Sequence, residues 1–322
     1  MSAAVSSAAI LEIRDLALSI GGARVVDGVS CAVRPGEVLA LVGESGCGKS
    51  LTALAAIGLL PRAVTLEGGE VLLDGEDLVA LPERRLRSMR GRRIAMIFQE
   101  PLAALDQLAT VGTQVAEATG RSVAAAREEV LAMLAEVGIS DPARRIAQYP
   151  FELSGGMAQR VMIATALISR PAVLIADEPT TALDVTIQAQ ILDLLRRLAV
   201  DRGTAIVLIT HDMGVVADIA ERVAVMYAGR IAETGPAAAL FARPRHPYTA
   251  LLLAALPRLS DEPKAPLAVI QGQVPLPSAF SAACRFADRC PLATERCRAE
   301  QPPLRDMGEG RQSACWHAEL VQ

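Results

Sequence analysis

The sequence has 322 residues, the length of about two ordinary domains. Hydrophobic residues make up 52% and charged residues 21%, so the chain can bury a sizeable core and is not a disordered protein. The 32 basic and 36 acidic residues leave a net charge of −4, and the absence of a basic excess argues against a dedicated nucleic-acid binder.

The chain has no segment typical of a membrane span or a signal peptide. Its longest apolar run, residues 51–61, has about half of the ~20 residues that a span needs. Residues 1–11 carry no basic residue and no long apolar core. We therefore expect a cytosolic chain, and any membrane part would have to come from a partner.

The first predicted elements are strands. Residues 11–42 open with alternating apolar and polar side chains around a Gly21-Gly22 turn, which predicts an antiparallel pair. The apolar run 37–42 predicts a buried strand. A second hairpin is predicted around residues 69–74, with Asp74-Gly75 as its turn.

Residues 43–50 read Gly-Glu-Ser-Gly-Cys-Gly-Lys-Ser and match the pattern G-x-x-x-x-G-K-[ST]. They follow the buried strand and precede an apolar helix, where a phosphate-binding loop must lie. Glycines let backbone N–H groups converge on phosphate oxygens, and the helix N-terminus adds partial positive charge. Lys49 is predicted to reach the β- and γ-phosphates, the Ser50 hydroxyl to bind Mg²⁺, and the Cys47 thiol to take no part. The predicted ATP-binding residues are Gly43, Glu44, Ser45, Gly46, Cys47, Gly48, Lys49, Ser50 and Leu51.

A helix is predicted over residues 121–137, and a strand–helix–strand crossover follows. Apolar strands at 172–176 and 204–209 flank a helix at 186–199, which is the unit of a parallel sheet.

The first of these strands ends in two carboxylates, Asp177 and Glu178. A strand that ends in Asp-Glu is often no more than a polar strand end. With the phosphate loop upstream, we expect Asp177 to hold Mg²⁺ through water and Glu178 to polarise the water that attacks the γ-phosphate.

Residues 153–160, Leu-Ser-Gly-Gly-Met-Ala-Gln-Arg, resemble the signature of ABC transporter ATP-binding subunits, with Met157 at the usual Gln position. The other family motifs occur along the chain in the order that is usual for the family. Gln99 matches the Q-loop, Asp184 in Thr-Ala-Leu-Asp the D-loop, and His211 the switch histidine. The resemblance covers about residues 11–240.

The resemblance implies an α/β P-loop NTPase cassette at residues 11–241. It would have a parallel core sheet, an antiparallel β subdomain and a helical subdomain at about 100–170. It also implies a head-to-tail dimer that sandwiches two ATPs. The catalytic residues would be Glu178, His211 and Gln99, and the Mg²⁺ ligands Ser50, Gln99 and Asp177. The residues that act on the partner's nucleotide would be Ser154, Gly155, Gly156, Met157 and Gln159.

One position departs from the family pattern. The family usually places an aromatic residue near the start of the domain, where it stacks on adenine, and this sequence has Ala23 there. A base–aromatic stack contributes ~1–3 kcal/mol, so weaker adenine binding is expected.

Four cysteines gather near the C-terminus: Cys284, Cys290, Cys297 and Cys315. Four thiolates at this spacing can hold Zn²⁺ or an iron–sulfur cluster, and two disulfides are the alternative. Residues 246–249, His-Pro-Tyr-Thr, and the cysteine segment resemble the C-terminal region of oligopeptide/dipeptide transporter ATPases. That resemblance implies a small domain at 242–322 with a [4Fe–4S] cluster, zinc being the alternative.

The resemblance implies the ATP-hydrolysing subunit of a di- or oligopeptide importer, peripheral on the cytoplasmic face of the cell membrane. Its partners would be a second, different ATPase, two transmembrane permeases and an extracytoplasmic substrate-binding protein, with no nucleic acid. A groove at the Q-loop and residues 148–152 would receive the permeases. The close alternative is an importer of nickel or another small solute. A soluble, non-transport ABC ATPase is a further alternative, but such proteins usually carry two cassettes or a long coiled-coil insertion.

Overall fold

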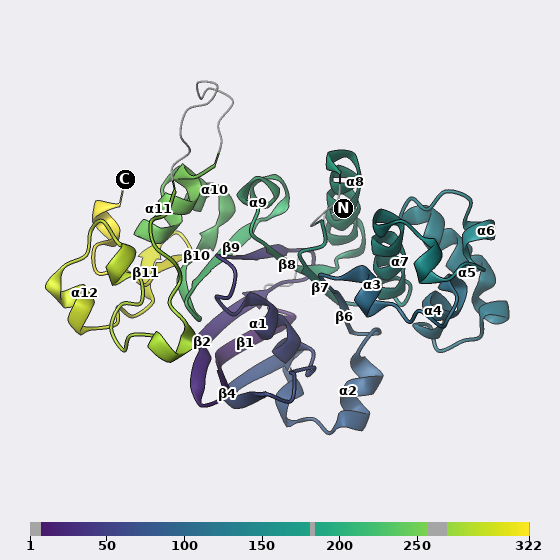
Figure 1. Ribbon diagram of the computed structural model, residues 1–322, viewed down its shortest axis with the longest axis horizontal. Helices are drawn as coiled ribbons and strands as arrows, with labels where there is room; N and C mark the ends of the chain where they lie inside the picture. The colour runs from purple at the N-terminus through teal and green to yellow at the C-terminus, as the bar shows by residue number, and fades with distance from the viewer. Residues whose placement is uncertain (1–7, 181–183, 257–268, 322) are drawn as a thin grey trace. The chain divides into compact units, whose positions relative to one another are not determined.

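The computed structural model describes residues 8–180, 184–256 and 269–321, so three D-loop residues, Thr181 to Leu183, lie outside the described part. The chain divides into two compact units (Figure 1). The first unit comprises Met1–Leu11, Val33–Val38 and Leu72–Ile209, and the second comprises Glu12–Ala32, Leu39–Val71 and Thr210–Gln322. The domain boundary near residue 242 stays a prediction.

Parallel strands form the centre of the first unit. Strands β6 (Ile94–Ile97), β7 (Val173–Asp177) and β8 (Ala205–Thr210) lie side by side in the order β8-β7-β6. All of their residues are buried, as expected for a parallel sheet that is covered on both faces. Helix α8 (Val185–Arg202) joins β7 to β8, which confirms the predicted crossover.

Short helices make up the rest of the first unit. Figure 1 shows α3 to α7 gathered in one group. Helix α5 begins after Ser122, whose hydroxyl accepts a hydrogen bond from the Ala125 N–H, and ends before Gly138, whose φ is +79°. Both are ordinary helix end signals and confirm the predicted helix there. The elements are α2 (Glu83–Met89), α3 (Pro101–Ala104), α4 (Val111–Glu117), α5 (Val123–Glu136), α6 (Pro142–Arg145), α7 (Gly155–Leu167) and the 3₁₀ turns Leu78–Ala80 and Pro150–Glu152.

Both predicted hairpins are present. Strands β4 (Val64–Leu73) and β5 (Glu76–Asp77) pair with Leu73 opposite Glu76. Asp74 and Gly75 between them both have positive φ, at 50° and 80°, as a type I′ turn requires. Gly21 and Gly22, at φ of 56° and 80°, join β1 (Leu11–Ile20) to β2 (Ala23–Val33) in the same way. In the second unit the strand order is β2-β1-β4.

A second sheet of this unit carries the phosphate loop and the C-terminal segment. Its order is β11-β12-β10-β9-β3, with β3 and β9 parallel and the other pairs antiparallel. Buried residues of β3 and β9 share one core with Tyr248 and Phe286 from the C-terminal part. The elements are β3 (Val38–Val42), α1 (Lys49–Ala56), α9 (Met213–Ile219), β9 (Arg222–Tyr227), β10 (Arg230–Pro236), α10 (Ala237–Ala242), α11 (Pro247–Ala254), α12 (Glu295–Ala299), β11 (Arg305–Gly308), β12 (Arg311–Ser313) and the 3₁₀ turns Pro277–Ala279, Ala287–Arg289 and Ala318–Leu320.

Within the described residues, no helix combines the length and the apolar character that a membrane crossing requires.

Candidate active site

The phosphate loop lies between β3 and α1, as the sequence predicts. Gly43 has φ of +152° and Gly48 has φ of +104°. A Cβ at Gly43 would collide with the Met226 carbonyl oxygen, and one at Gly48 would lie 2.9 Å from Val26 Cγ2. The glycines at both positions are therefore required by the local packing as well as by the backbone conformation.

Lys49 is folded into this loop. Its Nζ donates hydrogen bonds to the carbonyl oxygens of Gly43, at 2.8 Å, and Glu44, at 3.0 Å, and the residue is only 7% exposed. Helix α1 begins at the same residue, and Gly48 supplies no side-chain cap to its N-terminus. A buried ammonium beside an uncapped helix N-terminus provides an arrangement that attracts an anion.

The Cys47 side chain is buried against the loop. Burial raises the pKa of its thiol, and Lys49 opposes the shift only in part. A neutral, fully buried thiol is unreactive. The prediction that only the backbone of Cys47 matters is consistent with this environment, and its carbonyl accepts a hydrogen bond from the Gly229 N–H at 3.0 Å.

In the first unit, Gln99 and Glu178 are brought together. Gln99 Nε2 donates to Glu178 Oε2 at 3.1 Å, across 79 residues of sequence. Glu178 follows the buried Asp177 at the end of β7 and has φ of +47°, while its N–H donates to the Ile209 carbonyl at 2.9 Å. A left-handed conformation is unusual for glutamate, and such outliers concentrate at functional sites.

The signature residues lie at the start of α7. Ser154 is exposed and caps the helix, its Oγ accepting from the Met157 N–H at 3.4 Å. The Gln159 side chain, in contrast to the exposed Ser154, is buried. It is 3% exposed, and its Nε2 donates to the Pro179 carbonyl at 2.8 Å. Its side chain therefore ties the signature helix to the loop after β7, which differs from the expectation that it faces a partner's nucleotide.

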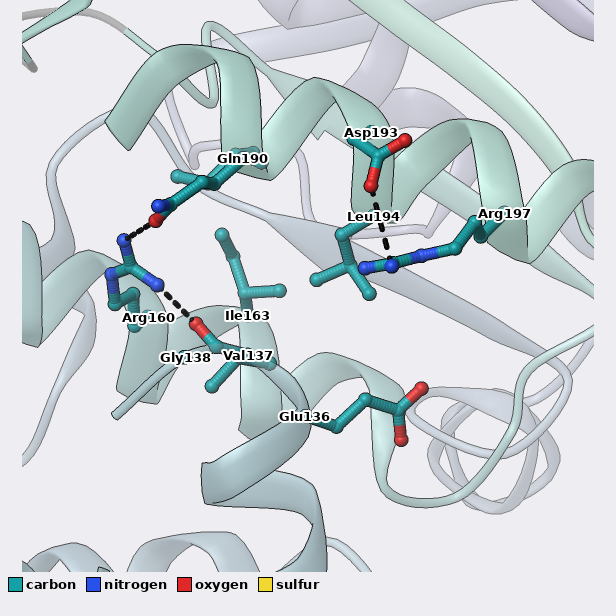
Figure 2. Close-up of a pocket in the computed structure, with 10 residues that line it drawn as sticks. Glu136, Val137, Gly138, Arg160, Ile163, Gln190, Asp193, Leu194 and Arg197 are labelled. Carbon is teal, nitrogen blue, oxygen red and sulfur yellow. Dashed lines mark hydrogen bonds and ion pairs between the residues drawn. The ribbon is translucent and has the colours of Figure 1, made fainter. Parts of the chain in front are cut away.

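Arg160, the next residue, has a structural role that the sequence pattern did not reveal. Figure 2 shows its guanidinium between α5 and α8. It donates to the Val137 carbonyl at 2.5 Å and to Gln190 Oε1 at 2.6 Å, beside a cavity of about 360 Å³. Gly138 leaves the room that this contact needs, since a Cβ there would collide with the guanidinium. The signature helix is thus fixed to both neighbouring helices.

We expect Arg160→Met to lower the free energy of unfolding by about 2–3 kcal/mol, because the buried Val137 carbonyl loses a charged donor and the Gln190 amide loses its partner. The matched control is Arg197→Met on the rim of the same cavity. Arg197 is exposed and pairs with Asp193 at 3.3 Å, so its loss is expected to cost less than about 1 kcal/mol. Urea unfolding of the two variants checks this, and equal losses would contradict the role given to Arg160.

Two further predicted residues lie beside helix starts. Asp184 caps α8, its Oδ1 accepting from the Ile187 N–H at 2.9 Å. His211 is exposed in the second unit, directly before Asp212, which caps α9. Ala23, at the expected adenine position, is the first residue of β2.

The four C-terminal cysteines lie in one region of the second unit. The Cys284 N–H donates to the Cys297 carbonyl at 3.1 Å. Burial, with a smaller contribution from the nearby cysteines, raises the pKa of Cys290 to about 11 and that of Cys315 to about 12. All four are free thiols, which contradicts two disulfides in this state of the chain. In the described part of the chain, however, no three His, Cys, Asp or Glu side chains are placed to hold a metal ion, so the geometry gives the cluster or zinc prediction no support.

Comparison with known families gives two matches in sequence order. The profile described as "ABC transporter" matches residues 26–181, and the profile described as "Oligopeptide/dipeptide transporter, C-terminal region" matches residues 232–297. A probable peptide ABC transporter ATP-binding protein of Sinorhizobium fredii is 50% identical over 97% of this chain and 96% of its own length. The dipeptide transport ATP-binding protein DppD of Escherichia coli is 48% identical over 91% of this chain and 90% of its own length.

Solved structures give the same fold. A dimeric bacterial ABC transporter cassette, MJ0796, aligns with a TM-score of 0.64 and 26% identity, over 70% of this chain and 98% of that one. The same cassette in a post-hydrolysis state bound to ADP and phosphate aligns equally well. The predicted cassette fold is confirmed.

Proposed function

The chain belongs to the family of ABC transporter ATP-binding subunits, which are ATPases, and we propose that it drives the uptake of di- and oligopeptides through partner permeases. The observation that carries the proposal is the order of the two family matches, a cassette followed by the C-terminal region of oligopeptide/dipeptide transporters. The high identity to DppD over nearly the whole chain supports it. The ATPase does not contact the solute in this scheme, so nickel or another small solute is the alternative cargo.

The loop at residues 43–50 would bind the phosphates of ATP. Lys49 would exchange its carbonyl partners for the β- and γ-phosphates, since its ammonium is already held at the loop. The predicted metal ligands are the Ser50 hydroxyl, the Gln99 amide and the Asp177 carboxylate, and hard oxygen donors of this kind fit Mg²⁺. When bound, Mg²⁺ supplies charge that offsets the developing negative charge on the phosphoryl oxygens.

Hydrolysis would depend on Glu178 as general base. Its hydrogen bond with Gln99 supports a linked pair, in which the amide orients the carboxylate toward the attacking water. His211, exposed after β8, would hydrogen-bond the γ-phosphate and so distinguish ATP from ADP.

A second cassette would complete each ATP site. Ser154, Gly155 and the α7 N-terminus are exposed, as is needed to meet a partner's γ-phosphate, and Asp184 would lie at the same interface. We propose that this second cassette belongs to a different ATPase chain. Gln159 would act indirectly, by holding α7 in place.

We propose that exposed apolar side chains of the first unit contribute to docking of the permeases. Phe151 is 68% exposed and stacks on Tyr149 with ring centroids 5.5 Å apart, and Leu108 is 90% exposed. Contiguous exposed apolar groups are a common feature of protein–protein contact surfaces. The chain would then lie at the cytoplasmic face of the membrane, with a substrate-binding protein delivering peptide from outside.

We also propose that Cys284, Cys290, Cys297 and Cys315 bind a [4Fe–4S] cluster, with Zn²⁺ as the alternative. The number of cysteines in this short segment and their free thiols support the proposal. The four side chains would have to move together to bind the metal. Iron, acid-labile sulfide and zinc should be measured in protein purified without oxygen. About four Fe and four sulfide per chain are expected. One zinc per chain would favour the alternative, and protein that contains no iron and no zinc would contradict the site.

The transport proposal is tested by ATP hydrolysis in the assembled membrane complex. Addition of the substrate-binding protein loaded with a dipeptide is expected to raise the rate. A rate raised only by a nickel-loaded binding protein would favour the alternative cargo.

A further inference from the structure

Glu44, the second residue of the phosphate loop, is held by a side chain from the far end of the chain. Arg289 donates from Nη1 to Glu44 Oε2 at 2.6 Å and from Nη2 to Oε1 at 3.0 Å, across 245 residues of sequence. The pair is bidentate, the geometry in which an arginine fixes both the position and the orientation of a carboxylate.

The guanidinium itself has little freedom. The Arg289 side chain is 6% exposed, and its Nε donates to the Gln271 carbonyl at 2.8 Å. Its Nη1 also lies 3.3 Å from the Tyr227 hydroxyl. Arginine stays protonated at physiological pH, so the pair with Glu44 is ionic.

The backbone of Glu44 is held as well. Its N–H donates to the Tyr248 hydroxyl at 2.9 Å. The Tyr248 ring is fully buried and packs against Tyr227, with centroids 4.7 Å apart, and against Phe286, at 5.4 Å. An aromatic cluster in the core therefore anchors the same residue whose carboxylate Arg289 binds.

A second arginine of the C-terminal segment supports residues that contact the loop. Arg285 Nη1 donates to the Ala228 carbonyl, and the next residue, Gly229, donates its N–H to the Cys47 carbonyl at 3.0 Å. Arg289 thus contacts the loop directly, and Arg285 supports it through Ala228 and Gly229.

We propose that Arg289 is a positioning residue for ATP binding, which fixes the phosphate loop through Glu44 and neutralises a carboxylate next to the polyphosphate. The inference rests on the proposed function, in that this loop must bind ATP. Without Arg289, the Glu44 carboxylate would repel the nucleotide and would no longer be held in one place. Both effects weaken ground-state and transition-state binding alike, so KM rises while kcat changes little.

The test is a double-mutant cycle on the full-length chain assembled with its partner subunits. We expect Arg289→Met to raise KM for ATP roughly tenfold, with kcat within about twofold. In the Glu44→Gln background the same substitution should raise KM less than about twofold, because no charge is then left unpaired. Arg289→Lys should recover part of the affinity, since lysine keeps the charge but lacks the planar fork. The matched control is Arg298→Met, at an exposed arginine of the same C-terminal segment.

A purely structural role for Arg289 predicts a different result, with equal losses in both Glu44 backgrounds and a fall in kcat. That result would overturn the inference, as would an unchanged KM in Arg289→Met. Failure of the unmodified chain to bind ATP would instead contradict the proposed function, so the two failures are distinguishable.

Discussion

Replacing Glu178 by Gln is expected to lower kcat for ATP by about 10²- to 10³-fold while ATP still binds. The amide keeps the size of the side chain and a hydrogen bond with Gln99, but it cannot take a proton from the attacking water. Because ATP is bound and not consumed, the closed dimer should accumulate. Single-turnover hydrolysis and size-exclusion chromatography with Mg-ATP would measure both effects.

Glu128→Gln on helix α5 is the matched control, since this glutamate is exposed and lies outside the candidate site. The same neutralisation there should leave kcat unchanged. Rapid turnover in Glu178→Gln would remove the assignment of Glu178 as the base.

Replacing Lys49 by Ala is expected to weaken ATP binding by roughly 10²-fold or more. The lost interaction is a charge-assisted hydrogen bond to phosphate, which contributes about 1.5–3 kcal/mol for each contact. Lys49→Arg should not restore the affinity, because a planar fork does not fit the space that the ammonium fills between the Gly43 and Glu44 carbonyls. Isothermal titration with ATP measures the loss.

The sequence offers an unusually clean control for this prediction. Lys49 and Lys264 are its two lysines, the other basic residues being arginines. Lys264→Ala should leave ATP affinity unchanged. Equal affinity in Lys49→Ala and Lys264→Ala would contradict the phosphate-binding role of the loop.

Features set by local chemistry could be predicted from the sequence. The Asp74-Gly75 turn and the end of α5 at Gly138 follow from residues that adopt positive φ at low cost. The phosphate loop follows from its glycines, since Gly43, Gly46 and Gly48 all have positive φ and neighbouring atoms leave no room for a Cβ at Gly43. Strand β6 could not be predicted, because its four residues are too few to show a hydrophobic period.

Features that depend on tertiary contacts could not be predicted from the sequence. Gln159 belongs to a motif by its position, but its direction is decided by the Pro179 carbonyl that it meets. The pair of Glu44 and Arg289 joins residues 245 positions apart, and neither residue's place in the sequence points to the other. The four cysteines could be found in the sequence, but among the described residues their side chains are not placed to hold a metal ion.

The central claim, that ATP hydrolysis by this chain powers peptide uptake, is tested most directly by transport in living cells. Uptake of a labelled dipeptide should be measured in the native host after deletion of this chain, and again after return of the unmodified chain or the Glu178→Gln variant. The account predicts that uptake is lost on deletion, restored by the unmodified chain and not by the variant. Full uptake without the chain, or equal restoration by both forms, would contradict it.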